Sequence, residues 1–309
     1  MQEKINYGGW PNCIRLYNDE IELIVTTDVG TRIIRFGFIN KQNFFYLSAE
    51  DSGATGGKDW RIYGGHRLWL APEGMPFSYY PDNEPVGYTY NDGTLKLTQA
   101  IESTSGIVKE IEITLSVHKN EVTVLHRLIN QGILDIELSP WALSVMAPGG
   151  RAIIPQEPHG EGNDYLLPAR SLALWQYTKM NDPRWIWGEK YIQAKQDPTK
   201  SKEQKIGMMN KQGWNAYALN GEVFINQFAF DPVAVYPDFG CNNEVYINGN
   251  FLEIETLGPL TKIASGGIVE HTEYWSLFKA EAGESEESID KNILPVVHTF
   301  KKEFLKRRG

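Results

Sequence analysis

Cysteine is scarce in this sequence, and its scarcity excludes several kinds of protein. The 309 residues include two cysteines, Cys13 and Cys241, and no Cys-x-x-Cys pair. Zinc ribbons, thioredoxin-type redox motifs and disulfide frameworks all need more cysteines or closer ones. The length allows one large domain or two ordinary ones.

Long apolar runs and basic charge are also lacking. No apolar run approaches the roughly 20 residues that span a bilayer, and the first eight residues lack the apolar core of a signal peptide. We therefore expect a cytoplasmic protein that has no membrane partner. The net charge is −9, whereas binding to nucleic acid requires a basic surface, so we expect no nucleic-acid partner. The basic cluster at 301–308 fits a solvated helix end.

Aromatic residues are abundant, and the main hydrophobic pattern has a period of two. Nine Trp and fifteen Tyr contribute to an aromatic fraction of 12%, and such side chains suit both strands and the apolar faces of sugar rings. Apolar and polar residues alternate at 110–117, as in a strand with one buried face. Asn-Gly or Asp-Gly pairs at 92–93, 220–221 and 248–249 favour hairpin turns. The sequence predicts an all-β fold, either a sandwich or a barrel.

Helical patterns are few. We expect short helices at 202–211 and in the C-terminal segment 288–309, where apolar residues recur at helical spacing. The polar segment 196–204 is interpreted as a surface loop. No internal repeat is found, so we expect one domain over 1–309 that ends in a helix and tail at 288–309.

The segment from 51 to 84 has no alternation, with six glycines and three prolines. Long irregular loops in compact domains are usually functional. Arg67 could bind a hydroxyl pair, a carboxylate or a phosphate, or form a structural pair with Glu73 or Asp82. Trp69 could stack on a sugar or fill the core. The candidate site residues in this segment are His66, Arg67, Trp69, Glu73, Asp82 and Asn83.

Two later segments also hold candidate residues. Trp141 lies in a Ser-Pro-Trp segment, and Asp238 and Asn242 flank a glycine. Glu253 and Glu255 are two residues apart, so they share one face of a predicted strand. Two such carboxylates fit either a solvated surface or an acid–base site.

Several of these motifs together resemble an uncharacterised bacterial family, DUF4380-like, of the galactose mutarotase-like superfamily. The motifs are GGHRLWLAPE with PDNEPV, SPWALSVMAPGG, NEVYINGNFLEIETLGP and EHTEYWSLF, between about Tyr17 and Phe278. The resemblance implies a large antiparallel β-sandwich (a supersandwich) with few short helices. It also implies that a sugar lies on the concave face of one curved sheet.

The resemblance also implies roles for individual residues. Aldose 1-epimerases carry a catalytic base in a Glu-Thr-Gln pattern on a late strand, and Glu255-Thr256-Leu257 matches it at two of three positions. Glu255 is therefore the expected base, with Glu253 as a second contact. In those enzymes the catalytic acid is a His in an Asn-His segment. The corresponding segment here contains Trp141 and no His. Trp141 then becomes a candidate stacking platform or a core residue.

The catalytic acid must therefore come from elsewhere. We expect His66, which follows two glycines, or His159, which lies in a proline-bounded loop. No His-x-His or zincin spacing and no phosphate loop is found, so we expect neither a metal nor a cofactor. The expected catalytic residues are Glu255 and His66. The expected substrate-binding residues are Arg67, Trp69, Glu73, Asp82, Asn83, Trp141, His159, Asp238, Asn242 and Glu253.

Three functions are compatible with these expectations. The first is an aldose 1-epimerase-like enzyme that acts on a free sugar or sugar derivative. The second is a carbohydrate-binding module without catalysis. The third is an isomerase or lyase that acts on an acidic sugar, for which Arg67 would be the carboxylate anchor. In each case the partner is a small carbohydrate.

Overall fold

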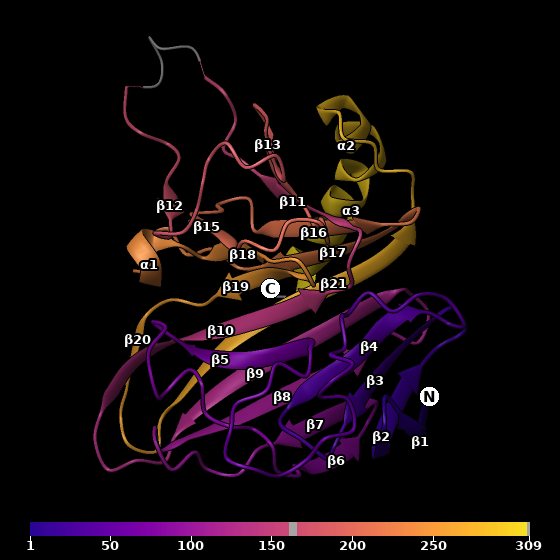
Figure 1. Cartoon of the computed structure of the whole chain (residues 1–309), viewed down its shortest axis with the longest axis vertical. Coiled ribbons are helices and arrows are strands. Elements are labelled where there is room, and N and C mark those ends of the chain that lie inside the picture. The colour runs from indigo at the N-terminus through magenta and orange to yellow at the C-terminus, as the bar shows by residue number, and fades with distance from the viewer. Residues whose placement is uncertain (161–165, 308–309) are drawn as a thin grey trace.

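The computed structural model describes residues 1–160 and 166–307, with side chains described up to residue 300. In this part of the chain two large antiparallel sheets pack face to face (Figure 1). The predicted all-β sandwich with few short helices is confirmed. Apolar side chains that alternate along the strands form the layer between the sheets, which is the usual way for two sheets to share a core.

The first sheet carries the candidate site. Within the described residues its strands follow the order β1-β2-β3-β4-β5-β10-β19-β18-β15-β12, and β20 pairs with β10 outside this path. The bounds are β1 (Gln2–Tyr7), β2 (Trp10–Tyr17), β3 (Ile21–Thr26), β4 (Arg32–Phe38), β5 (Gly65–Ala71), β10 (Ile136–Met146), β12 (Leu172–Leu174), β15 (Gln204–Met208), β18 (Asn243–Ile247), β19 (Leu252–Leu257) and β20 (Thr261–Ile263).

The second sheet follows the order β13-β14-β11-β16-β17-β21-β9-β8-β7-β6. Two predicted turns join neighbouring strands here, at Asp92-Gly93 and Asn220-Gly221, and all four residues have positive φ. The bounds are β6 (Gly87–Asn91), β7 (Thr94–Thr98), β8 (Ile107–Leu115), β9 (Glu121–Asn130), β11 (Arg151–Pro155), β13 (Trp185–Trp187), β14 (Tyr191–Lys195), β16 (Trp214–Leu219), β17 (Glu222–Phe228) and β21 (Ile268–Lys279).

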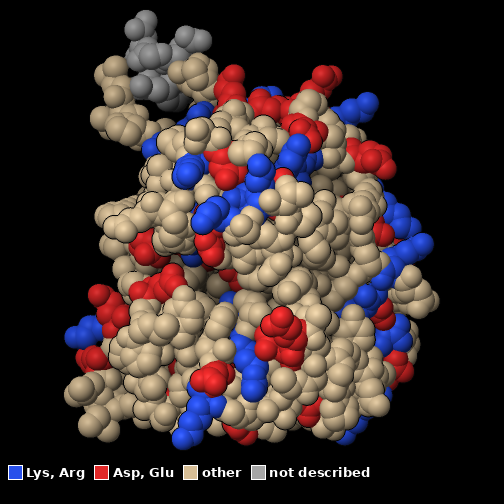
Figure 2. Space-filling model, viewed as in Figure 1, with Lys and Arg blue, Asp and Glu red and all other residues tan. Residues whose placement is uncertain are grey.

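Three helices complete the described elements: α1 (Pro237–Gly240), α2 (Glu286–Asn292) and α3 (Leu294–Arg307). Ile289 and Val297 pack with Ile153 and Ile225, so α2 and α3 cover the outer face of β11, β16 and β17 (Figure 1). None of the helices in the described ranges has the length and apolar character needed to cross a membrane. Acidic and basic side chains are intermixed on the face drawn in Figure 2, without a large area of one sign.

One expected helix is wrong. Residues 204–208 form strand β15, which pairs with β18 on one side and β12 on the other. Ile206 and Met208 belong to the core between the sheets, so Lys205 and Gly207 face the other way. The polar residues around this short strand concealed its alternation from the sequence analysis.

Candidate functional site

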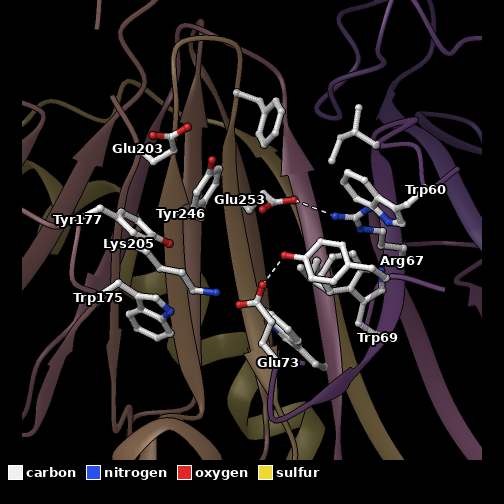
Figure 3. A pocket seen from close by; sticks show the side chains of 15 residues that line it. Trp60, Arg67, Trp69, Glu73, Trp175, Tyr177, Glu203, Lys205, Tyr246 and Glu253 are labelled. Carbon is white, nitrogen blue, oxygen red and sulfur yellow. Dashed lines mark hydrogen bonds and ion pairs between the residues drawn. The ribbon is translucent and has the colours of Figure 1, made fainter. Parts of the chain in front are cut away.

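A cavity of about 470 Å³ lies on the face of the first sheet that points away from the second sheet. Its floor comes from five neighbouring strands, β5, β10, β19, β18 and β15, and its wall from segment 51–84 and the residues around 175 (Figure 3). The lining residues are Trp60, Ile62, Arg67, Trp69, Glu73, Tyr79, Trp141, Leu143, Trp175, Tyr177, Glu203, Lys205, Tyr246, Phe251 and Glu253.

Strand register places the floor residues side by side. Leu143 lies opposite Arg67 on one neighbouring strand and opposite Glu255 on the other. Tyr246 lies opposite Glu253 and Lys205. Residues opposite each other in an antiparallel sheet project from the same face, so charged groups from three strands meet here.

Arg67 and Glu253 form an ion pair in the cavity floor. The Arg67 Nη2 atom lies 3.3 Å from Glu253 Oε1, and the guanidinium lies 4.3 Å from the Trp69 ring and 5.3 Å from that of Trp60. Burial lowers the pKa of Arg67 to about 10. Burial also raises the pKa of Glu253 to about 7, because desolvation outweighs the opposing effect of Arg67, and Glu255 raises it further.

Two nitrogen atoms of Arg67 lack a partner. Nε and Nη1 are buried and make no hydrogen bond within the chain. An unsatisfied buried donor costs about 1–3 kcal/mol, so these atoms are placed to donate to a bound molecule or water. This is the feature of the floor that points most directly to a ligand.

Lys205 holds a second group of charges beneath the cavity. Its Nζ atom lies 2.9 Å from Glu255 Oε2 and 2.8 Å from Glu244 Oε2. It also lies 4.6 Å from the centre of the Trp141 ring and 4.8 Å from that of Trp175. Burial alone would lower the pKa of Lys205, but Glu255 and Glu244 hold it well above the usual range. We call Arg67, Lys205, Glu253 and Glu255 the cavity cluster.

Glu255 is fully buried and does not line the cavity. Its Oε2 accepts hydrogen bonds from Lys205 and, at 2.8 Å, from Trp141 Nε1. Of the sequence-predicted residues, Arg67, Trp69, Glu73, Trp141 and Glu253 do line it, and Glu255 lies directly behind Trp141 and Lys205. At the rim, the Tyr79 hydroxyl donates a hydrogen bond to Glu73 (Figure 3). Burial raises the pKa of Tyr79, so this phenol remains protonated.

His66 does not lie in the cavity, which corrects its expected placement at the site. Alternation along β5 turns it to the opposite face from Arg67. It is fully buried between the sheets, 2.9 Å from Ser144 Oγ and 2.7 Å from His126 Nε2. Burial lowers its pKa well below the usual range. Its ring therefore cannot reach a sugar in the cavity.

A closed hydrogen-bond network surrounds His66. His126 Nδ1 donates to the His271 carbonyl, and His271 Nε2 lies 2.7 Å from Thr256 Oγ1. Glu273 accepts from Thr256, from Asn226 and from Trp275 Nε1. We call His66, His126, His271 and Glu273 the interior cluster.

The interior cluster has the residue types of a metal site. Ligand atoms of His66, His126 and Glu273 lie within 4.8 Å of one another. However, two nitrogen ligands on a tetrahedral zinc ion, each about 2.0–2.1 Å from the metal, are separated by roughly 3.3 Å. The 2.7 Å between the His66 and His126 Nε2 atoms is instead a hydrogen-bond distance. We therefore interpret this cluster as a hydrogen-bonded network.

Four further candidates lie outside the cavity lining, and their contacts explain why. Asp82 pairs with Arg32 at 2.7 Å, and Asn83 accepts from the Tyr63 hydroxyl, so both hold segment 51–84 in place. Asn242 exchanges two hydrogen bonds with the Asn210 backbone. Asp238 lies in α1 with a left-handed backbone, φ 50°. Their expected placement in the site is corrected.

His159 is also outside the cavity lining, and it is exposed. Conversely, the sequence analysis missed several lining residues. They are Trp60, Tyr79, Trp175, Tyr177, Glu203, Lys205, Tyr246 and Phe251. The signal that identifies Lys205 is the alternation Lys-Ile-Gly-Met at 205–208, which places Lys205 on the face opposite Ile206 and Met208.

Comparison with solved structures shows what this fold is similar to. A galactose mutarotase-like protein from Lactobacillus casei ATCC 334 has a TM-score of 0.58 at 8% identity, covering 86% of this chain and 100% of that chain. The Slr1438 protein from Synechocystis sp. PCC 6803 has a TM-score of 0.56 at 12% identity, covering 90% and 100%. A galactose mutarotase-like protein from Clostridium acetobutylicum has a TM-score of 0.54 at 10% identity, covering 90% and 98%.

Comparisons at the level of sequence are negative, since no family model and no curated protein matches the chain. The structural neighbours establish the galactose mutarotase-like fold. Identities this low establish the fold alone, because one fold supports many activities.

Proposed function

We propose that this protein binds a carbohydrate of monosaccharide size in the cavity above β5, β10 and β19. The observation that carries the proposal is that the cavity floor offers unpartnered hydrogen-bond donors next to an acceptor. Buried Arg67 Nε and Nη1 have no partner, and the Glu253 carboxylate lies beside them. Hydroxyl groups both donate and accept hydrogen bonds, so a polyhydroxylated ring can satisfy both kinds of group at once.

The size and the walls of the cavity support this proposal. A volume of about 470 Å³ falls within the ~300–1,000 Å³ typical of small-molecule sites. Aromatic side chains surround the charged floor, and they offer apolar area to the C–H faces of a sugar. One face of the Trp69 and Trp141 rings is occupied by Arg67 and Lys205. Stacking is therefore assigned to Tyr246 and Tyr177 instead. The motif resemblance to the DUF4380-like family agrees with this proposal.

We further propose that the bound sugar is interconverted between its anomers. In that reaction a base removes the proton of the anomeric hydroxyl and an acid protonates the ring oxygen. The C1–O5 bond then opens, C1 rotates, and the ring closes with both protons returned. Glu253 is the group suited to exchange the first proton, because it lines the cavity and its pKa is raised to about 7. Glu255 then acts by positioning Lys205 and Trp141.

The Tyr79 hydroxyl is assigned as the donor to the ring oxygen, for which its single proton turns from Glu73 to the ligand. It lines the cavity, is hydrogen-bonded to Glu73 and remains protonated. Tyrosine is less common than histidine as a general acid, but it serves in this role in other enzymes.

A second candidate function is carbohydrate binding without catalysis. One observation favours it: no histidine among the described residues lines the cavity. A histidine titrates near neutral pH and is the acid that the resemblance implies. Binding and catalysis therefore need separate measurements.

The test combines calorimetry with NMR exchange between α and β anomeric signals over a panel of hexoses and hexose derivatives. We expect binding of at least one sugar and accelerated exchange, which Glu253→Gln slows by roughly 10²–10⁴-fold. Binding without acceleration would leave only the second candidate. If no carbohydrate binds, both functions are refuted.

A further inference from the structure

Acidic groups outnumber basic groups around the cavity. Among the described residues that line or directly underlie it, five are glutamates and two are cationic. The glutamates are Glu73, Glu203, Glu244, Glu253 and Glu255, and the cations are Arg67 and Lys205. A cavity with this composition attracts positive charge.

Both cations are already neutralised. Arg67 lies against Glu253 and between two tryptophan rings. Lys205 lies between Glu244 and Glu255 and against two other aromatic rings. Neither is available to balance the charge of an anionic ligand. A carboxylate or phosphate on the ligand would lie beside Glu73, Glu203 and Glu253, which line the cavity, and like charges in a partly desolvated site repel strongly.

Two other acidic side chains act on Glu253. This carboxyl is buried, and both Glu255 and Glu73 raise its pKa, so their charges act on it at short range. Glu73 approaches from the rim, whereas Glu253 projects from the floor (Figure 3). Glu253 pairs with Arg67 at 3.3 Å and Glu255 pairs with Lys205 at 2.9 Å, whereas Glu73 forms no ion pair with a described residue.

We propose that the ligand is a cationic carbohydrate, an amino sugar whose ammonium group lies between Glu253 and Glu73. This inference rests on the proposed function and specifies its substrate class. The ammonium supplies three N–H donors to carboxylate oxygens, and the remaining hydroxyls accept from the free nitrogen atoms of Arg67. The acidic-sugar function, with Arg67 as the carboxylate anchor, is disfavoured because a carboxylate bound to Arg67 would lie against Glu253, which already pairs with Nη2.

Proton linkage gives this proposal a distinctive signature. Glu253, with a pKa of about 7, is about half protonated at pH 7. A cation bound beside it favours the ionised form, so binding lowers its pKa and releases a fraction of a proton per ligand. A neutral sugar exerts no such charge effect.

The experiment is calorimetric titration at pH 7.0 in two buffers of different ionisation enthalpy. The probes are glucosamine, galactosamine and mannosamine, each compared with its parent hexose and its N-acetyl derivative, together with glucuronate and galacturonate. We expect one amino sugar to bind at least tenfold more tightly than its parent hexose and its N-acetyl derivative. We also expect proton release for that amine alone.

Glu73→Gln should reduce the preference of amine over hexose by at least threefold. The matched control is Glu137→Gln on β10, an exposed glutamate outside the cavity lining, which should leave the preference unchanged. The buffer comparison uses the wild-type protein, so the proposal can be tested even if a variant fails to fold.

The other possible results of this titration refute either the amino-sugar ligand or carbohydrate binding as a whole. Equal affinity for amine and parent hexose, without proton release, overturns the cationic ligand but leaves carbohydrate binding standing. Tighter binding of a uronic acid overturns it in favour of an anionic substrate. Absence of binding by every probe refutes the proposed function together with this inference.

Discussion

The cavity cluster and the interior cluster lie on opposite sides of the first sheet, and they differ in how completely their polar groups are paired. His66 and Arg67 are neighbours on β5, and Glu255 and Thr256 are neighbours on β19. In each pair one side chain faces the cavity side and the other faces the core. Two chemically similar groups of residues are thus separated by a single layer of backbone.

The difference in pairing indicates different roles. In the interior cluster His66, His126 and His271 are linked to partners, and Glu273 accepts three hydrogen bonds. In the cavity cluster Arg67 Nε, Arg67 Nη1 and Glu255 Oε1 have no partner. A hydrogen-bond network in which every polar group has a partner makes the interior rigid, whereas unpartnered polar groups beside a cavity are available to a ligand. The comparison therefore assigns stability to the interior cluster and binding to the cavity cluster.

The largest expected effect on stability is at Lys205, which belongs to the cavity cluster but also pairs with two buried carboxyl groups. Lys205→Met should destabilise the protein by about 3–5 kcal/mol, because it leaves Glu244 and Glu255 buried without a cation. Urea unfolding at pH 7 measures the change. Lys262→Met, at an exposed lysine, is the control and should cost no more than about 0.5 kcal/mol. A small effect at Lys205 would mean that the buried carboxyls are protonated and need no counter-charge.

The pH dependence of stability should have opposite signs in the two clusters. Burial lowers the pKa of His271 to about 3, so the unfolded chain binds the extra proton between pH 3 and 6.5 and stability rises with pH in this window. Burial raises the pKa of Glu253 from 4.5 to about 7, so the folded protein holds the extra proton and stability falls as pH rises from 4.5 to 7.

Glu253→Gln isolates the second contribution. The stability of the variant relative to wild type should increase by about 3 kcal/mol between pH 4.5 and 7.5, since each pKa unit is worth about 1.36 kcal/mol. Urea unfolding of both proteins across this range provides the measurement. A difference that does not vary with pH would show that Glu253 titrates normally in the folded protein.

A smaller effect on stability, with none on binding, is expected in the interior. His66→Gln should cost about 1–3 kcal/mol, because His126 and Ser144 lose a buried partner. Carbohydrate affinity, measured by calorimetry on the folded variant, should remain at the wild-type value. A folded variant that no longer binds sugar would place His66 in the site after all.

The smallest effect on stability is expected at Arg67. Arg67→Lys keeps the charge beside Glu253 but removes the planar donors Nε and Nη1. Carbohydrate affinity should fall about tenfold, equivalent to about 1.4 kcal/mol, with little change in the urea midpoint. Unchanged affinity would separate the cavity from ligand binding.

Much of the fold could be predicted from the sequence, because alternation and hairpin turns are local signals. Two predicted turns, at 92–93 and 220–221, form as expected. For the site, the sequence supplies candidate residues, and the structure shows which of them line the cavity. Arg67, Trp69, Glu73, Trp141 and Glu253 line the cavity, and they were found through motifs and through the shared strand face of Glu253 and Glu255.

The errors have a common physical origin. Every residue of β5 is buried, so Gly-His-Arg-Leu-Trp-Leu-Ala shows no contrast between its faces, and His66 was grouped with Arg67. Lys205 reaches the site only because β15 pairs with β18, about 40 residues later in the chain. Pairing between distant strands is not encoded in local pattern, so neither position could be deduced from neighbouring residues.

The most direct test of the central claim is a crystal structure after soaking with a mixture of neutral, amino and acidic monosaccharides. The account predicts density for one sugar ring above β5 and β19, in contact with Arg67 and Glu253. An empty cavity at saturating sugar, or a sugar bound elsewhere while the cavity stays empty, would contradict it.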